Sequence, residues 1–360
     1  MKIKIIFLIS LITIISCSTL KNKNDLNNKN NLLVSILDKY RDSLKSNNYG
    51  LVALIRKKGK VEKYAIGFSD SEHKMTTDKI FNIGSLTKMF TAVLIMQEVK
   101  KGNLDLKDTI GKYFIKDFAQ NKNVDTKITI EQLLRHESGL GEVVVDTIVN
   151  QAFQNPYHEY NNTFLYNKIP KKIFEKGEKF RYTNTNYILL GYILEVINNK
   201  PYSELIKERI FIPCHMENTY AFLPSENQNL AHPMYNKQDL LEFATYKFYY
   251  NYGFSAGCVF SNIDDLNKFF INLYETNKLL DRELFEKMTK FKNNYGYGIE
   301  KILIPDKNIY YIGHGGDNLS YTNRNFYNPK TKTLVILMAN HLFDKYCWKI
   351  GQEILYEYDK

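Results

Sequence analysis

Two apolar stretches of the chain predict buried helices. Residues 89–96 read Met-Phe-Thr-Ala-Val-Leu-Ile-Met, and residues 187–194 read Tyr-Ile-Leu-Leu-Gly-Tyr-Ile-Leu, so each is apolar on nearly every face. Segments of this kind are typical of helices packed on all sides. Ser85 comes just before the first stretch, and the good capping residues 183–185 (Thr-Asn-Thr) come just before the second.

Strand patterns gather toward the two ends of the chain. Residues 51–55 and 61–66 are rich in strand formers and flank Lys58-Gly59-Lys60, which predicts a hairpin. Residues 333–338 predict a further strand, and residues 310–312 carry strand formers ahead of a glycine pair. Helical spacing of apolar residues over 32–40 and 349–358 predicts a helix near each end.

This distribution predicts one α+β domain. Its sheet is assembled from both termini and flanked by helices, and a mostly helical lobe is inserted between the two sets of strands. We expect the sheet lobe over about 32–90 and 291–360, and the helical lobe over about 91–290. A chain of this length buries a substantial core as one two-lobed unit, with the active site in the crevice between the lobes.

The N-terminus predicts export. Lys2 and Lys4 precede an apolar run over 5–15 that is too short to span a bilayer comfortably, and Ser16-Cys17 follows it. The segment resembles a bacterial lipoprotein signal, which implies cleavage after residue 16 and lipidation of Cys17. A plain secretory leader or an uncleaved anchor stays open as an alternative. Residues 17–31 are polar and predict a tether, so we expect a lipid-anchored, extracytoplasmic protein of the cell envelope.

A Ser-x-x-Lys string places a candidate nucleophile, Ser85, in the first turn of the first buried helix. Ser85 and Lys88 are three residues apart, so on a helix their Cβ atoms lie on one face, roughly 5–6 Å apart. The positive helix N-terminus favours both the alkoxide and a neutral amine. The same string occurs at Ser71–Lys74, where polar neighbours predict a turn. Context therefore assigns the nucleophile to Ser85 and its proton partner to Lys88.

A Tyr-x-Asn string supplies a candidate acid and base. Tyr182 precedes the second buried helix, and its phenol, if held near Lys88, would act as base toward Ser85 and then as acid toward the leaving group. Asn184 would offer its amide to a substrate carbonyl. The local pattern also fits a core tyrosine beside a capping asparagine.

A His-Gly-Gly string supplies a candidate substrate-binding edge. His314, Gly315 and Gly316 follow strand-forming residues, and paired glycines let another backbone approach closely. The backbone N–H of Asp317, beside that of Ser85, is the candidate donor to an oxyanion. A turn between two strands is the alternative interpretation of the glycines.

The three strings in this order resemble those of serine hydrolases of the class C β-lactamase and D,D-carboxypeptidase type, a group of penicillin-binding-protein-like enzymes that includes D-aminopeptidases and carboxylesterases. The resemblance runs from about Tyr49 to the C-terminus. Further stretches that match are Leu133–Leu140, Ile210–Pro213, Ser255–Gly257 and Tyr295–Gly298. It implies a β-lactamase/transpeptidase-like fold with an antiparallel sheet.

Carried over, the resemblance implies that Ser85 is acylated, that Lys88 and Tyr182 move its proton, and that Asn184 and His314 contact substrate. The protein would then be a D,D-peptidase or β-lactamase-like hydrolase of amide or ester bonds. Gly315 stands where the family often has a hydroxyl residue, and a histidine replaces a common lysine, so we expect weak β-lactamase activity. A carboxylesterase and a penicillin-binding sensor without turnover are the alternatives.

Composition changes this picture little. The formal net charge of +10 is spread along the chain, and no nucleic-acid-binding motif accompanies it. No metal-ligand spacing or phosphate-binding loop is present, so we expect no cofactor and no metal. Besides Cys17 there are Cys214, Cys258 and Cys347, whose disulfide state the spacing leaves open. We expect a monomer whose partners are a small peptide, β-lactam or ester substrate and, through the N-terminal lipid, the membrane.

Overall fold

The computed structural model describes residues 32–45, 48–113, 121–158, 164–221, 223, 229–244, 246–304, 309–342 and 344–359. The predicted leader, Cys17 and the tether lie outside these residues. No helix within the described ranges is long and apolar enough to cross a membrane.

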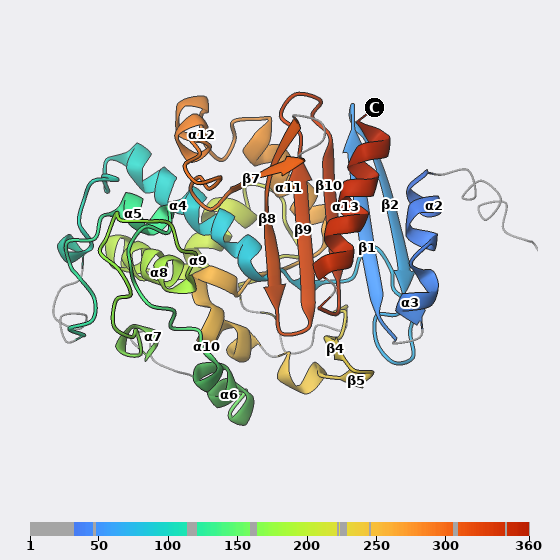
Figure 1. Cartoon of the computed structure of the whole chain (residues 1–360), viewed down its shortest axis with the longest axis horizontal. Helices are drawn as coiled ribbons and strands as arrows, with labels where there is room; N and C mark the ends of the chain where they lie inside the picture. Colours follow the sequence, from blue (N-terminus) through green and yellow to red (C-terminus); the bar gives the residue numbers. More distant parts are fainter. Residues whose placement is uncertain are drawn as a thin grey trace, which may run out of the picture.

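A six-stranded antiparallel sheet forms one side of the molecule, and most of the helices form the other (Figure 1). Its strand order is β2-β1-β10-β9-β8-β7. The strands are β1 (Gly50–Lys57), β2 (Lys60–Gly67), β7 (Glu300–Ile304), β8 (Ile309–Asn318), β9 (Tyr321–Tyr327) and β10 (Leu334–Ala339). The sheet is therefore built from both termini, and this confirms the predicted fold class.

Helices and short strands fill the sequence between β2 and β7. The longer helices are α4 (Thr87–Lys101), α6 (Asp146–Gln154), α8 (Asn184–Asn198), α10 (Tyr246–Gly257), α11 (Ile263–Tyr274) and α12 (Arg282–Met288). The shorter ones are η2 (Ile110–Lys112), α5 (Ile130–Leu134), α7 (Phe164–Asn167), α9 (Tyr202–Ile206), η3 (Lys207–Phe211) and η4 (Leu241–Phe243). Two small sheets pair β3 (Phe81–Asn82) with β6 (Phe260–Ser261), and β4 (Met234–Tyr235) with β5 (Gln238–Asp239). The predicted lobe boundaries stay predictions.

Both faces of the sheet are buried, because alternate residues of its central strands pack against different layers. Leu51, Ala53 and Ile55 of β1 pack with α2 (Leu32–Asp38) and α13 (Asp344–Tyr358). Val52 and Leu54 instead join the core of the helical lobe, which includes α4 and α8. Figure 1 shows α13 crossing one face of the sheet, with α2 and α3 (Arg41–Lys45) next to β2 at the edge of the sheet.

The chain ends agree with the predicted elements, with shifted boundaries. The predicted helix over 32–40 ends at Asp38, and the predicted helix over 349–358 begins earlier, at Asp344. The earlier start follows from packing, since the fully buried Cys347 continues the apolar stripe of Ile350 and Ile354 one turn toward the N-terminus.

Candidate active site

Ser85 lies in a tight turn that is clamped against the sheet. The α-helix α4 begins at Thr87, two residues later than predicted, and a 3₁₀ turn over Gly84–Leu86 precedes it. Gly84 has φ +52°, a left-handed conformation that favours glycine. A Cβ on Gly316 of β8 would lie 2.1 Å from the carbonyl oxygen of Ile83. The close approach of strand and turn therefore requires glycine at 316.

Lys88 is fully buried and points at the nucleophile. Its Nζ lies 2.8 Å from Ser85 Oγ, 2.7 Å from Asn184 Oδ1 and 2.9 Å from the carbonyl oxygen of Ala256. These three acceptors match the three N–H bonds of an ammonium group. Burial nevertheless lowers the pKa of Lys88 to about 7, against the opposing charges of Glu142 and Glu300. A substantial neutral fraction therefore exists near neutral pH, able to accept a proton from Ser85.

Tyr182 lies on the same crevice, in the segment just before α8. Lys88 Nζ is 5.0 Å from the centroid of its ring. Burial raises the pKa of Tyr182 well above the ordinary value, although a hydrogen bond with Ser85 acts in the opposite direction. The phenol is therefore protonated near neutral pH. Folding brings Ser85, Lys88 and Tyr182 into one site, as the sequence analysis required.

Asn184 is held by a carboxylate that the sequence analysis did not single out. Glu142 Oε2 accepts hydrogen bonds from the backbone N–H of Asn184, at 2.8 Å, and from its Nδ2, at 3.2 Å. The amide is thus oriented with Oδ1 toward Lys88. A single glutamate in a loop carries no local signal of this role. Asn184 also lines a cavity next to Ser85, where its predicted contact with substrate stays a prediction.

His314 is buried at the end of a chain of hydrogen bonds. His136 Nδ1 accepts from the N–H of Thr183 and from Asn186 Nδ2, so its proton lies on Nε2, which is 3.3 Å from Tyr295 Oη. Tyr295 Oη is in turn 3.0 Å from His314 Nε2. His136 Nε2–H therefore donates a hydrogen bond to Tyr295 Oη, and Tyr295 Oη–H donates one to His314 Nε2.

The contact of the other ring nitrogen of His314 fixes which nitrogen carries the proton. Nδ1 lies 2.5 Å from the carbonyl oxygen of Gly315, so it donates and Nε2 accepts. Burial, and next the charge of Lys88, lower the pKa of His314 to about 3. His314 is therefore neutral at physiological pH, in agreement with the expectation that it gives a weak anchor for a carboxylate.

The glycine string lies along a strand and not in a turn. β8 pairs with β9 through Asn318, whereas β7 pairs with β8 only as far as Gly313. From His314 onward, one edge of β8 has no neighbouring strand among the described residues. Gly84 lies against this edge, since a Cβ on it would be 3.1 Å from the backbone nitrogen of Asp317. The predicted pair of oxyanion donors, the N–H groups of Ser85 and Asp317, thus belongs to two adjoining segments.

Two cavities meet at Ser85. One, of about 320 Å³, has a largely apolar wall that includes Val144, Val149, Tyr252 and Leu319. The other, of about 590 Å³, contains Tyr182, His314 and several charged side chains. Ser85 and Asp317 line both cavities, so a substrate held at Ser85 would extend into each of them.

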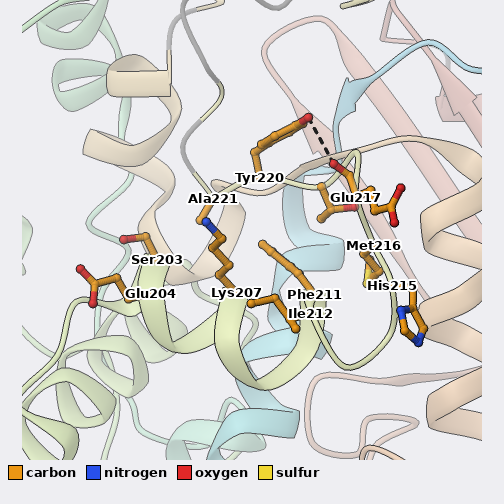
Figure 2. A pocket seen from close by; sticks show the side chains of 11 residues that line it. Ser203, Glu204, Lys207, Phe211, Ile212, His215, Met216, Glu217, Tyr220 and Ala221 are labelled. Atoms are coloured by element: carbon orange, nitrogen blue, oxygen red, sulfur yellow. Dashed lines mark hydrogen bonds between the residues drawn. The ribbon is translucent and has the colours of Figure 1, made fainter.

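A further cavity of about 770 Å³ lies away from the predicted site residues. Figure 2 shows it between α9, η3 and the loop that follows, with Tyr220 donating a hydrogen bond to the carbonyl oxygen of Glu217. None of the predicted site residues lines it. Within the described residues no group of three His, Cys, Asp or Glu side chains could hold a metal ion. Cys214 and Cys258 are free thiols, and both are buried, as is Cys347.

A serine beside a buried amine and a phenol, at the start of a helix that abuts a strand edge, defines a serine acyl-transfer enzyme of the β-lactamase/transpeptidase-like fold. Residues 36–346 match the family model described as Beta-lactamase, and the chain belongs to this family of serine hydrolases.

Individual relatives agree with this assignment. The protein PbpX of Bacillus subtilis is 25% identical over 313 residues, which are 84% of this chain and 73% of PbpX. Protein flp of Staphylococcus aureus (strain MRSA252) is 30% identical over 194 residues, which are 52% of this chain and 38% of flp. The chain thus matches well under half of flp's length.

A solved structure shows the same fold at low identity. The D-amino acid amidase from Ochrobactrum anthropi SV3, complexed with D-phenylalanine, superposes with a TM-score of 0.75 at 20% identity. The match covers 92% of this chain and 99% of the amidase.

Proposed function

We propose that the protein hydrolyses amide bonds of D-amino-acid-containing peptides, or related amides, through an acyl-Ser85 intermediate. The observation that carries the proposal is the contact of 2.8 Å between Lys88 Nζ and Ser85 Oγ, made by an amine whose pKa burial lowers to about 7. The D-amino acid amidase with the same fold supports the D configuration by analogy.

In the proposed acylation step Lys88, and not Tyr182 as the sequence suggested, is the base, because the phenol is protonated near neutral pH. Neutral Lys88 accepts the proton of Ser85 as Oγ attacks the substrate carbonyl carbon. The N–H groups of Ser85 and Asp317 would stabilise the resulting oxyanion. Tyr182, which is protonated, gives its proton to the leaving nitrogen as the C–N bond breaks, and Lys88 returns a proton to the phenol. Water then attacks the ester carbonyl and releases Ser85.

The third string argues against a β-lactam as the preferred substrate. His314 carries no charge at neutral pH, and Gly315 offers no hydroxyl group, so two groups that would bind the carboxylate of such an antibiotic are missing. We expect slow or absent cephalosporin hydrolysis. Efficient turnover of a cephalosporin would contradict the proposed substrate class.

Mass spectrometry of the intact protein tests the chemistry directly. After incubation with short esters, D-Ala-D-Ala peptides and penicillin, we expect an acyl adduct on Ser85 that is absent from Ser85→Ala. The added mass identifies the acyl group. A burst of product equal to the amount of protein, with no steady state after it, would instead support a sensor.

We also propose that the enzyme is a lipoprotein of the cell envelope, anchored through Cys17. Support comes from the charged N-terminus, the short apolar run and the cysteine that follows it. Labelling of cells with a fatty-acid analogue should mark the wild-type protein and leave Cys17→Ala unmarked. Equal labelling of both would reject this anchor.

A further inference from the structure

Only one of the two cavities at Ser85 is lined by Tyr182. Tyr182, the proposed acid toward the leaving group, lines the cavity of about 590 Å³ and not the smaller, largely apolar one. A proton passes over hydrogen-bonding distance, so the leaving group must lie on the side of Tyr182. We call the cavity lined by Tyr182, Glu300 and His314 the leaving-group cavity.

Glu300 places a carboxylate in the wall of this cavity without a hydrogen-bond donor. It is the first residue of β7, and its side chain is 31% exposed. The nearest basic nitrogen is His314 Nε2, at 3.8 Å. That nitrogen accepts the proton of Tyr295 and belongs to a neutral ring, so it supplies neither a proton nor a charge. Within the described residues, no hydrogen bond reaches the Glu300 carboxylate.

The two cations of the cavity wall already contact other groups. Arg324 donates to both carboxylate oxygens of Asp317, at 3.0 and 2.8 Å. Lys301 Nζ lies over the ring of Tyr310, 4.7 Å from its centroid. A carboxylate on the leaving group would have to compete with Asp317 for Arg324 and would face Glu300 in the same cavity.

We propose that Glu300 binds a cationic group on the leaving-group half of the substrate, such as an ammonium group a few bonds from the scissile carbonyl. A cation there would give the Glu300 carboxylate an ionic partner that the described part of the protein does not supply. The inference rests on the proposed acyl-Ser85 chemistry and deepens it. A site of this kind differs from one that binds a carboxylate at the end of the leaving group.

The charge of Glu300 depends on pH. Burial raises the pKa of Glu300 to about 7, and the positive charges of Arg324 and Lys88 oppose the rise while Asp317 adds to it. The titratable and charged groups around Glu300 are Lys88, Tyr182, Tyr295, Lys301, His314, Asp317 and Arg324. Above this pKa the carboxylate is ionised, and a bound cation favours ionisation further. The preference for cations should therefore strengthen between pH 6 and pH 8.

Three thioesters of N-acetyl-D-alanine test the proposal, because they share the acyl group and differ in the charge of the leaving thiol. The thiols are 2-(trimethylammonio)ethanethiol, which is cationic, 3,3-dimethylbutanethiol, which is neutral, and 3-mercaptopropionate, which is anionic. Release of thiol at pH 8 gives kcat/KM for each. Comparing the ratio between two substrates in the wild type with the same ratio in a variant cancels the intrinsic reactivity of each thioester, including the acidity of its thiol.

For the wild-type protein we expect the cationic thioester to exceed the neutral one by about tenfold in kcat/KM, with the anionic one lowest. Glu300→Gln should lower the ratio of kcat/KM for the cationic substrate to that for the neutral substrate by about fivefold or more relative to wild type. Glu300→Asp should keep part of the preference. Glu283→Gln on α12, a remote glutamate whose side chain is 79% exposed, should behave as wild type.

The outcomes separate this inference from the proposed function. Equal ratios in wild type and Glu300→Gln, or a preference for the anionic thiol, would overturn the role of Glu300 while leaving Ser85 chemistry intact. An equal loss on all three substrates would assign Glu300 a structural role and overturn the inference as well. No Ser85-dependent hydrolysis of any thioester would overturn both proposals.

Discussion

The two faces of the central sheet are both buried, but they differ in the side chains that they bury. The face under α2 and α13 is packed with aliphatic side chains such as Leu51 and Leu337, and fully buried side chains there serve stability. The opposite side, where β8 meets α4, holds a buried lysine and histidine. The change in the pKa of Lys88, from 10.5 to about 7, corresponds to roughly 5 kcal/mol against its charged form.

One layer stabilises the sheet, and the other keeps desolvated polar groups in place. The fully buried amine of Lys88 and the buried polar ring of His314 both carry a desolvation cost, which well-packed surroundings must offset. Substitutions on the helical-lobe side should therefore change catalysis with little effect on folding, and substitutions on the α13 side should do the reverse.

The sharpest test of this comparison is removal of the nucleophile. Ser85→Ala should lower kcat for any substrate by at least about 10³-fold, since the covalent route is lost, with little change in the thermal midpoint. Ser71→Ala, in the second Ser-x-x-Lys string, is the matched control, because Ser71 lies exposed outside the site. Hydrolysis that persists in Ser85→Ala and falls in Ser71→Ala would show that Ser71, and not Ser85, is the nucleophile.

Two adjacent glycines of β8 provide the next test. A Cβ at Gly316 would collide with the backbone of Ile83, whereas one at Gly315 would lie 3.2 Å from the Arg324 side chain. Gly316→Ala should lower kcat by about 10²-fold by displacing the oxyanion donors, and Gly315→Ala by less than about threefold. Steady-state kinetics of both variants measures this. A larger loss in Gly315→Ala than in Gly316→Ala would contradict the importance of the close contact between Gly316 and Ile83.

The pH profile gives a smaller effect. Protonated Lys88 cannot accept the Ser85 proton, so kcat/KM for a neutral substrate should fall about tenfold per pH unit below pH 7 and level off above it. His314, whose pKa is lowered to about 3, should not contribute to this limb. Lys88→Met should leave only a residual rate, and that rate should not show the fall below pH 7. An unchanged limb in that variant would assign the titration to another group.

On the α13 side we expect the smallest effect on catalysis. Leu337→Ala removes a fully buried side chain of β10 and should lower the free energy of unfolding by about 2–5 kcal/mol. At a temperature where the variant stays folded, kcat and KM should remain within about twofold of wild type. Denaturant unfolding and steady-state kinetics measure the two quantities. A large change in kcat would show that the two faces are coupled.

Much of the fold could be predicted because its signals are local. The hairpin of β1 and β2 follows from two strand patterns around Lys58 and Gly59, and the buried helices α4 and α8 follow from unbroken apolar runs. The start of α4 was predicted two residues early. Its first turn is tightened into a 3₁₀ turn where Gly84 meets β8, and no sequence window covers both segments.

The site was predictable in part for the same reason. Ser85 and Lys88 are linked by helical spacing. No local pattern predicted that four other residues would lie at the site, namely Glu142, Tyr295, Glu300 and Arg324. An isolated carboxylate or phenol looks the same in a loop on the surface as in one that faces a nucleophile. The roles assigned to Tyr182, Asn184 and Asp317 remain predictions.

The class of fold, the order of the three strings and the chemistry of each side chain follow from the amino-acid sequence, since apolar periodicity and short spacings act within a few residues. Which protons and charges those side chains carry depends instead on the folded arrangement. The pKa values of Lys88, His314 and Glu300 depend on burial and on partners far away in the chain, which exist only after the sheet and the helical lobe have closed around Ser85.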